Sequence, residues 1–438
     1  MNSIRNHARQ IWDAAVDAVK PAPLVRASLF ELGDTLRGAS RILVLGAGKA
    51  GAAMAAAVES SLPDLLDRVE GIVNVPADAV VPLRKIRLNA ARPAATNFPT
   101  ADGVRGAVEM LRLAREAGPN DVALCLLSGG GSALLPAPAD GITLADKLAI
   151  TQLLHRCGAT INEMNCVRKH LSAIKGGRLA QAFAGKALVS LIISDVISDP
   201  LDVIASGPTA PDSSTFADAL AILERFRLTD QVTPMILDHL RRGVAGEIAE
   251  TPKSLPGNVR NIVLGNNLKA LAAAQRCAES LGYRTLNLGS CLEGETRHVA
   301  MTHAGIARSI RENSIPLAPP VCILSGGETT VTLGPQSGKG GRNQEFVLAA
   351  ITKLQPMAEI VVLSGGTDGE DGPTDAAGAF ADAGTVQRAA ALGLDAAAFL
   401  NRNDAYNFFD QTGDLIKTGL TQTNVMDVRV IVIGRRAL

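Results

Sequence analysis

The sequence of 438 residues lacks a net charge, because 43 Lys and Arg residues balance 43 Asp and Glu residues. A balanced chain has no global field to attract nucleic acid or an anionic membrane, so any anion must be held by a local site. The longest apolar runs have the length of strands, and the first twenty residues read as an amphipathic helix and not as a signal peptide. We therefore expect a cytoplasmic globular protein whose partners are small molecules, with no nucleic acid and no membrane; a homodimer is compatible with the sequence.

Cysteines and aromatic residues are scarce. The six cysteines are scattered, with no Cys-x-x-Cys pair and no histidine at metal-ligand spacing, which gives no sign of a zinc site. Aromatic residues make up 3% of the chain, whereas 42 residues are glycine. This combination indicates an α/β protein with many tight turns between strands and helices.

Several enzyme signatures are also absent. The chain contains no GxxxxGK[ST] phosphate loop, no HRD or DFG pattern of protein kinases, and no GxSxG turn of serine hydrolases. A P-loop enzyme and a protein kinase are therefore excluded, and hydrolase chemistry has little support.

Short β-branched runs alternate with longer helical patterns, which is typical of βαβ units and a mostly parallel sheet. Strands are predicted at residues 41–45, 71–75, 86–89, 122–127 and 187–194, and, in the second half, at 260–264, 284–288, 321–324, 360–363 and 428–433. The chain is too long for one hydrophobic core, and the segment TPKSLPGN at 251–258 breaks both periodicities. We predict two α/β domains, residues 1–245 and 246–438.

The tripeptide Ser-Gly-Gly follows an apolar strand three times, at Ser128–Gly130, Ser325–Gly327 and Ser364–Gly366. The first copy continues into Gly131 and Ser132, and the second ends on Glu328. Glycines at the carboxyl end of a strand let backbone N–H groups face a ligand, and this edge of an open parallel sheet is where ligands bind. Tight turns alone would explain one copy, whereas three copies favour a shared role in anion binding.

The segment LVLGAGKAG at 43–51 matches the GxGxxG dinucleotide fingerprint through Gly46, Gly48 and Gly51. The match is weak, because the next predicted strand ends at Val75 without the acidic residue that would hold a ribose. Lys49, inside the turn and at the start of a predicted helix, is better suited to a phosphate or carboxylate oxygen.

Cationic side chains gather in two other segments. INEMNCVRKHLSAIKGGRLA at 161–180 carries Arg168 and Lys175, although a charge run of this kind is usually a solvated helix face. GGRNQEF at 340–346 places Arg342 between glycines and a predicted helix, where its fork could bind phosphate or carboxylate oxygens.

Carboxylates follow two of the predicted strands. Asp195 ends the most apolar strand of the first half, and Asp368 lies at a strand tip in the acidic, glycine-rich run LSGGTDGEDGPTDAAGAF at 363–380. A carboxylate at such a tip could hold Mg²⁺ or accept a proton from a substrate hydroxyl. Asp199 and Asp202 are interpreted as helix caps.

Together these segments resemble the glycerate 2-kinase family with a MOFRL C-terminal domain, which was formerly also described as hydroxypyruvate reductase. The resemblance runs in order along the whole chain. It is carried by LVLGAGKAG, LLSGGGSALL, INEMNCVRKHLSAIKGGRLA, ISDVISDPLDVIASGPT, LSGGETTV, GKGGRNQEF, LSGGTDGEDGPTDAAGAF and NDAYNFF.

The resemblance implies ATP-dependent phosphorylation of D-glycerate at its 2-hydroxyl, with Mg²⁺, to give 2-phosphoglycerate. It also implies a Rossmann-like N-terminal domain, a smaller MOFRL-type α/β domain and an active site in the cleft between them. Lys49 and Arg342 match the family's active-site cations, and Asp195 and Asp368 match its carboxylates, which are the expected metal ligands.

The expected binding residues for substrate or nucleotide lie on the same loops. They are Gly46, Gly48, Arg92, Ser128, Gly129, Gly130, Gly131, Ser132, Arg168, Lys175, Gly326, Gly327, Glu328, Gly365 and Gly366. Arg92, in AARPAAT, stands where the family has a histidine before proline, and it could still hold a carboxylate.

Two other functions remain open. An NAD(P)H-dependent hydroxypyruvate reductase would use the GxGxxG turn, with His170 as the proton donor. A sensor of nucleotides or sugar acids would bind without turnover, although such a protein needs no set of catalytic acids and bases.

Overall fold

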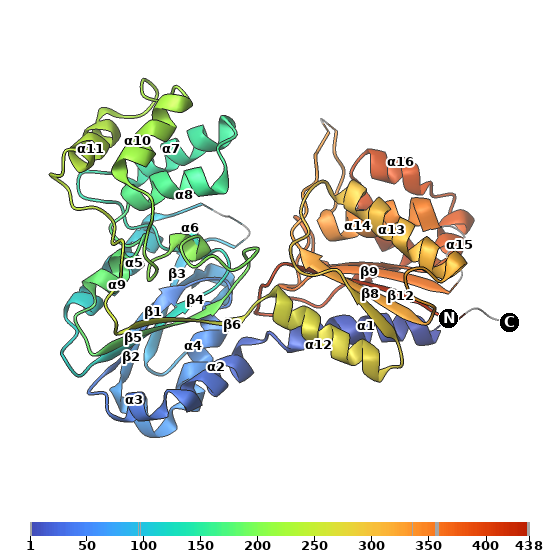
Figure 1. The fold of residues 1–438 in the computed structure, drawn as a ribbon, viewed down its shortest axis with the longest axis horizontal. Coiled ribbons are helices and arrows are strands. Elements are labelled where there is room, and N and C mark those ends of the chain that lie inside the picture. The colour runs from blue at the N-terminus through green and yellow to red at the C-terminus, as the bar shows by residue number, and fades with distance from the viewer. Residues whose placement is uncertain (1, 95, 97, 335, 355–358, 436–438) are drawn as a thin grey trace. The chain divides into compact units, whose positions relative to one another are not determined.

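The computed structural model describes residues 2–94, 96, 98–334, 336–354 and 359–435. The chain forms two compact units, and each contains one six-stranded sheet (Figure 1). The first unit comprises residues 21–264, and the second comprises residues 1–20 together with 265–438. The chain therefore passes from one unit to the other twice.

The sheet of the first unit has the strand order β3-β2-β1-β4-β5-β6. Its strands are β1 (Ile42–Ala47), β2 (Val69–Pro76), β3 (Ile86–Arg92), β4 (Val122–Leu127), β5 (Ala187–Ile193) and β6 (Val259–Gly265). Strands β1 to β5 pair in parallel. Every residue of β1 and β4 is buried, as expected for central strands that helices cover on both faces. This order is that of a Rossmann fold.

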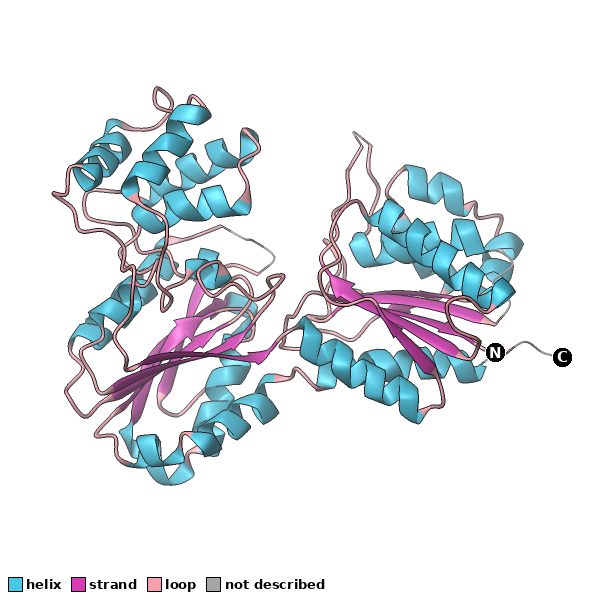
Figure 2. Ribbon diagram, in the orientation of Figure 1, coloured by secondary structure: helices cyan, strands magenta, loops and turns pink. Residues whose placement is uncertain are grey.

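The helices of the first unit cover both faces of this sheet and also form a layer beyond it (Figures 1 and 2). They are α2 (Pro21–Glu31), α3 (Gly33–Arg37), α4 (Gly51–Ser61), α5 (Ala101–Arg115), α6 (Gly131–Leu134), α7 (Leu144–Arg156), α8 (Ile161–His170), α9 (Arg178–Ala182), α10 (Phe216–Arg225) and α11 (Pro234–Val244), with short 3₁₀ turns η1 (Pro63–Arg68), η2 (Ala77–Ala79) and η3 (Ile204–Ser206).

Helices α7, α8, α10 and α11 form a small helical layer with its own apolar core, which includes Leu154, Val167 and Phe216. Three of these helices begin with a threonine whose side chain accepts from the backbone N–H three residues later, at Thr143, Thr160 and Thr215. In each case the acidic side chain at that later position bonds back to the threonine N–H. This capping box fixes the helix starts from local sequence alone.

The sheet of the second unit is mixed, with the order β11-β10-β9-β12-β8-β7. Its strands are β7 (Arg284–Asn287), β8 (Val321–Gly327), β9 (Ile360–Gly366), β10 (Gly378–Ala381), β11 (Leu415–Ile416) and β12 (Asp427–Ile433). Strand β12 runs antiparallel to both of its neighbours, β8 and β9. Because β8 and β9 therefore run the same way, their carboxyl ends meet at one edge, beside the first residue of β12.

Helices α1 and α12 cover one face of this sheet, and the others cover the opposite face (Figure 1). They are α1 (Asn2–Asp17), α12 (Asn267–Ser280), α13 (Thr296–Asn313), α14 (Arg342–Leu354), α15 (Ala383–Ala391), α16 (Ala396–Asn401) and α17 (Ala405–Thr412).

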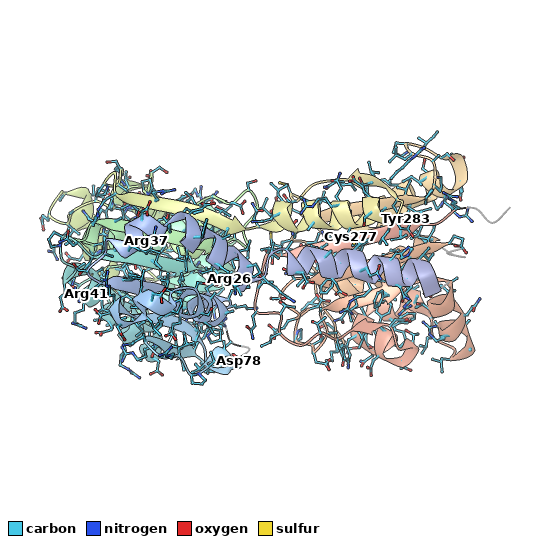
Figure 3. All side chains as sticks on the ribbon, turned by 90° about the horizontal axis from the view of Figure 1, so that it is seen from below. Arg26, Arg37, Arg41, Asp78, Cys277 and Tyr283 are labelled. Atoms are coloured by element: carbon cyan, nitrogen blue, oxygen red, sulfur yellow. The ribbon has the colours of Figure 1, made fainter. Side chains whose placement is uncertain are left out.

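The N-terminal helix α1 belongs to the second unit. Trp12 is buried and its indole N–H lies 3.4 Å from the carbonyl oxygen of Gly365 on β9. Arg5 forms ion pairs with Asp382 and Asp414 at 3.0 and 2.7 Å. The ring of His7 lies 2.7 Å from the hydroxyl of Tyr283, which follows α12 where the two helices run side by side (Figure 3).

The two-domain α/β architecture is confirmed, but the units are divided differently from the ranges 1–245 and 246–438. The strand predicted at 260–264 is β6, which extends the first sheet next to β5. The segment 251–258 therefore connects α11 to an edge strand and not one unit to the next. The other difference is α1, whose apolar face is buried by a sheet that the chain forms only later.

Gly365 allows a test of this packing. A Cβ atom on Gly365 would lie 2.8 Å from the indole nitrogen of Trp12, whereas a Cβ on Gly305, within the exposed face of α13, would meet nothing within 4 Å. We expect Gly365→Ala to destabilise the second unit by about 1–3 kcal/mol and Gly305→Ala to stabilise it by about 0.5–1 kcal/mol. Trp12 is the single tryptophan of the chain, so its fluorescence during urea unfolding reports on this unit. Equal effects of the two substitutions would contradict the packing described.

Candidate functional site

The first unit offers a ligand site at the carboxyl ends of β1 and β4. In this strand order, β1 and β4 send their following helices to opposite faces of the sheet, which opens a crevice beyond the strand ends. Gly46 lies near the end of β1, and Gly48 and Lys49 follow in the turn. The turn after β4 contains Ser128–Gly130 and leads into Gly131, the first residue of α6. The structure thus brings together two of the predicted glycine-rich segments.

The glycines of the β1 turn allow the two turns to approach each other closely. A Cβ atom on Gly46 would lie 2.0 Å from the carbonyl oxygen of Leu126, and one on Gly48 would lie 2.0 Å from Oγ of Ser128. The backbone N–H of Lys49 donates to Gly129 O at 2.9 Å, and that of Ala50 donates to Ser128 Oγ at 3.0 Å. The N–H groups that we expected to be available beside Lys49 are therefore already bonded within the protein.

The side chains of Lys49 and Arg92 lie next to the Ser128–Gly131 loop. A Cβ atom on Gly130 would be 3.5 Å from Nη2 of Arg92 and 3.8 Å from Cγ of Lys49. Gly130 has φ +75°, so a residue with a side chain would be strained there. Arg92 is 6% exposed at the end of β3. Two predicted cations thus meet at one glycine turn.

Lys175 is buried beneath the same loop. Its ammonium donates to the backbone oxygen of Ser132 at 2.7 Å, to Ser132 Oγ at 2.7 Å, and to Ser206 Oγ at 3.4 Å. Burial lowers the pKa of Lys175 well below its usual value, and the neighbouring cations Lys147 and Arg168 lower it further. Arg168 is half-buried on α8, and burial lowers the pKa of its guanidinium.

Asp195 is half-buried two residues after the end of β5, at the same edge of the sheet. The interpretation of Asp199 and Asp202 as helix caps is wrong. Asp202 forms an ion pair with Lys169 at 3.0 Å, and Asp199 has a left-handed backbone with φ 54°. The cap position of the next helix, η3, is Val203.

At the edge of the second sheet, the glycines of two Ser-Gly-Gly segments make room for helices. A Cβ atom on Gly326 would lie 1.7 Å from Oδ1 of Asn267, at the start of α12, and Gly365 meets Trp12 of α1 as described above. Gly327, with φ +118°, and Gly366 end their strands beside Asp427. The packing accounts for Gly326 and Gly365 without a ligand, so the shared role in anion binding stays a prediction.

Asp427, the first residue of β12, organises this edge. Its buried carboxylate accepts from Nε of Arg342 at 2.8 Å, from Nδ2 of Asn343 at 2.8 Å and from Nη2 of Arg429 at 3.1 Å. Nη1 of Arg342 donates to Glu328 Oε1 at 2.7 Å. Burial lowers the pKa of Arg342, but Asp427 and Glu328 outweigh it and raise the pKa overall. The sequence analysis missed Asp427, although two charged residues at the start of an apolar strand, DVRVIVI, were a usable signal.

Asp371 is a second residue that the sequence analysis missed as a member of the site. Its carboxylate accepts from the backbone N–H groups of Asn343 and Gln344 at 3.0 and 2.8 Å, at the start of α14. Burial raises the pKa of Asp371 to about 7, with a further contribution from Asp427, against the opposing effect of those hydrogen bonds. Asp371 therefore positions the helix that carries Arg342.

Glu328 is exposed and Asp368 half-buried at this edge, so both carboxylates are accessible to a ligand. Asp368 is half-buried in the turn after β9, and Glu328 has a raised pKa, caused first by burial and also by Asp427 and Asp368. Within the described residues, no three His, Cys, Asp or Glu side chains are grouped so as to hold a metal ion. Magnesium bound to phosphate needs only one or two protein carboxylates, which Glu328 and Asp368 can supply.

No helix among the described residues is long and apolar enough to cross a membrane. Two family models match the chain: one describes a domain of unknown function, DUF4147, over residues 7–241, and the other the MOFRL family, over residues 321–427. A crystal structure of glycerate kinase from Thermotoga maritima matches with a TM-score of 0.89 and 34% identity, over 99% of this chain and 100% of that chain. A glycerate 2-kinase from Pyrococcus horikoshii is 37% identical over 96% of this chain and 93% of its own length.

The chain belongs to the glycerate kinase family. A further relative, from Agrobacterium vitis, is 43% identical over 99% of this chain and 95% of its own length, and is named as a hydroxypyruvate reductase. The glycerate kinase matches cover both units, so the family's architecture includes the sheet edges that carry Lys49 and Arg342.

The Asp427 network gives the next test. Replacing Asp427 with Asn leaves Arg342 and Arg429 without their buried counter-charge, which we expect to cost about 3–5 kcal/mol of stability. Asp410→Asn removes an exposed carboxylate that lies 3.7 Å from Lys417, and we expect a change below about 0.5 kcal/mol. Urea unfolding followed by Trp12 fluorescence measures both. A loss of less than about 1 kcal/mol in Asp427→Asn would show that the network does not depend on this charge.

Proposed function

We propose that the protein transfers the γ-phosphoryl group of ATP, with Mg²⁺, to the 2-hydroxyl of D-glycerate and releases 2-phosphoglycerate and ADP. Family membership makes the chain an enzyme, a kinase with an alcohol group as phosphoryl acceptor. The observation that carries the proposal is the match to glycerate kinases along almost the full length of the chain, through both sheets.

The two sheet edges contain the charges that this reaction needs. Phosphoryl transfer depends mostly on positioning and on neutralising the charge of the transferred group. Lys49 and Arg92 meet at the Gly130 turn, and Arg342 presents its guanidinium between Asp427 and Glu328. In this proposal these cations bind phosphate or carboxylate oxygens.

Asp195 and Asp368 are assigned to the metal and to the acceptor hydroxyl. Each is half-buried and follows a strand end of its own sheet, where a carboxylate can reach a ligand at that edge. One of them would hold Mg²⁺, which neutralises phosphate charge when bound, and the other would orient the 2-hydroxyl.

The alternative function, an NAD(P)H-dependent hydroxypyruvate reductase, is favoured by the name of the Agrobacterium vitis relative. Two observations count against it. A dinucleotide site uses the N–H groups of the glycine-rich turn for the pyrophosphate, but those of Lys49 and Ala50 are bonded to the β4 turn. His170, the proposed proton donor, is fully buried, with one ring nitrogen 2.8 Å from Cys166 O and the other 3.2 Å from Glu250.

The activity is tested by incubating the purified protein with D-glycerate, ATP and Mg²⁺. ADP is measured with pyruvate kinase and lactate dehydrogenase, and 2-phosphoglycerate is measured separately through enolase. We expect both products in equal amounts. ADP without 2-phosphoglycerate would place the phosphate on another hydroxyl, and NADH oxidation with hydroxypyruvate in the absence of kinase activity would establish the reductase.

Lys49 provides a specific test of the site. We expect Lys49→Met to reduce kcat/KM for phosphorylation by about 100- to 1,000-fold, because a cation that stabilises transition-state charge is lost. Lys186→Met is the matched control, since Lys186 is exposed before β5, and it should retain full activity. If Lys49→Met keeps more than about a tenth of the activity, this lysine does not stabilise the transition state.

A further inference from the structure

Three basic residues of the first unit are buried or half-buried and form no ion pair with a described carboxylate. Lys147 is 8% exposed and donates to the backbone oxygen of Leu171 at 2.9 Å. Lys175 is 3% exposed and donates only to neutral oxygens of Ser132 and Ser206. Half-buried Arg168 makes no hydrogen bond or ion pair with any residue that the structure describes.

Two acidic residues of this part of the fold, Asp202 and Asp212, serve a different cation. Asp202 and Asp212 both pair with Lys169, at 3.0 and 3.1 Å. Asp212 also approaches Gly176, next to Lys175, but its Oδ1 is shared by Lys169 and Ser214. Charge neutralisation at Lys169 therefore leaves the other three cations uncompensated.

A chain of hydrogen bonds leads from Lys175 towards the Ser132 hydroxyl. Oγ of Ser206 donates to Asn165 Oδ1 at 3.0 Å, so it can accept from Ser132, whose Oγ is 2.9 Å away, and from Lys175. Ser132 is half-buried and lies on the β4 loop, whereas Ser206 and Asn165 are buried. This arrangement satisfies the three protons of the ammonium and uses the Ser132 proton in the bond to Ser206, so the Ser132 hydroxyl must exchange that bond to donate to a ligand.

The backbone around Ser206 is held in an unfavourable conformation. Ser206 and its neighbour Ala205 are left-handed, with φ 60° and 51°, although neither is glycine. Such a conformation persists only where the surrounding contacts impose it, and it is found preferentially at functional sites. The strain places Oγ of Ser206 between Lys175, Ser132 and Asn165.

We propose that the carboxylate of the hydroxy-acid substrate binds at this cluster, against the guanidinium of Arg168 and the hydroxyl of Ser132, with Lys175 behind them. The inference rests on the proposed function and assigns one end of its substrate. A planar guanidinium matches a carboxylate through two parallel hydrogen bonds. The phosphates of a nucleotide arrive with Mg²⁺, and Arg168, Lys175 and Ser132 offer that ion no carboxylate ligand, so a metal-free monoanion is the better occupant.

The protonation of the lysines agrees with this occupant. Burial and the charge of Arg168 lower the pKa of Lys147 to about 7, and the pKa of Lys175 is lowered by burial and by both neighbouring cations. A bound carboxylate would offset these repulsions and raise both pKa values. Binding should then be accompanied by proton uptake near and above pH 7.

The first experiment is calorimetry on the full chain with three ligands: D-glycerate, glycerol and ATP–Mg²⁺. Because Arg168 has no described partner, Arg168→Met can be made without breaking a contact of the fold. We expect it to weaken glycerate binding on the order of 10- to 100-fold and to leave glycerol and ATP–Mg²⁺ binding unchanged. Arg156→Met, at the exposed end of α7, is the matched control and should bind all three ligands like the natural chain.

The second experiment measures proton uptake. The enthalpy of glycerate binding at pH 8 should depend on the ionisation enthalpy of the buffer in the natural chain, and this dependence should shrink in Lys175→Met. A purely structural role of Lys175 would change affinity without changing the number of protons taken up. If Lys175→Met does not fold, Arg168→Met still decides the assignment.

The outcomes separate this inference from the proposed function. Equal glycerate affinity in Arg168→Met and Arg156→Met, in a protein that phosphorylates glycerate, overturns the carboxylate site and leaves the kinase intact. A selective loss of ATP–Mg²⁺ affinity in Arg168→Met assigns the cluster to phosphate instead and also overturns it. A natural chain that neither phosphorylates nor binds glycerate, lactate or other 2-hydroxy acids overturns both.

Discussion

Asp427 begins the central strand β12 of the second sheet. Its carboxylate accepts hydrogen bonds from Arg342 and Asn343 at the start of α14, and from Arg429 two residues further along β12. The carboxylate can do this because β8 and β9 end on either side of it. A buried charge is tolerated only when it is paired and hydrogen-bonded. The position of the predicted active-site arginine therefore depends on a residue about 85 positions away along the chain.

The cations at the edges of the two sheets are surrounded by different groups. In the second sheet, each described cation at the edge is matched by Asp427 or Glu328. In the first, Lys175 and Lys147 lie among neutral oxygens. A cation paired with a carboxylate keeps a fixed geometry. A buried cation among neutral oxygens is electrostatically unfavourable, and the binding of an anion beside it is therefore favoured. An anionic ligand beside Lys175 and Lys147 would therefore stabilise their charged forms.

Local features were predictable from the sequence, and long-range ones were not. The strands β1, β4 and β5 were found because each is an apolar run with turn residues on both sides, and the position of Lys49 followed from the GAGKAG turn. The pairing of β6 with β5 could not be predicted, because the sequence of an edge strand does not show which of two sheets it joins. The packing of Gly326 and Gly365 could not be predicted, because the sequence does not show that Asn267 and Trp12 approach them.

The uneven division of the chain has a consequence for how the protein is made. Helix α1 precedes the first unit along the chain, but the partners that bury Trp12 and pair Arg5 lie on β9, at Asp382 and at Asp414. During synthesis, domains generally fold as units from the N-terminus. Residues 21–264 can thus complete their sheet before the strands that bury the apolar face of α1 have been synthesised.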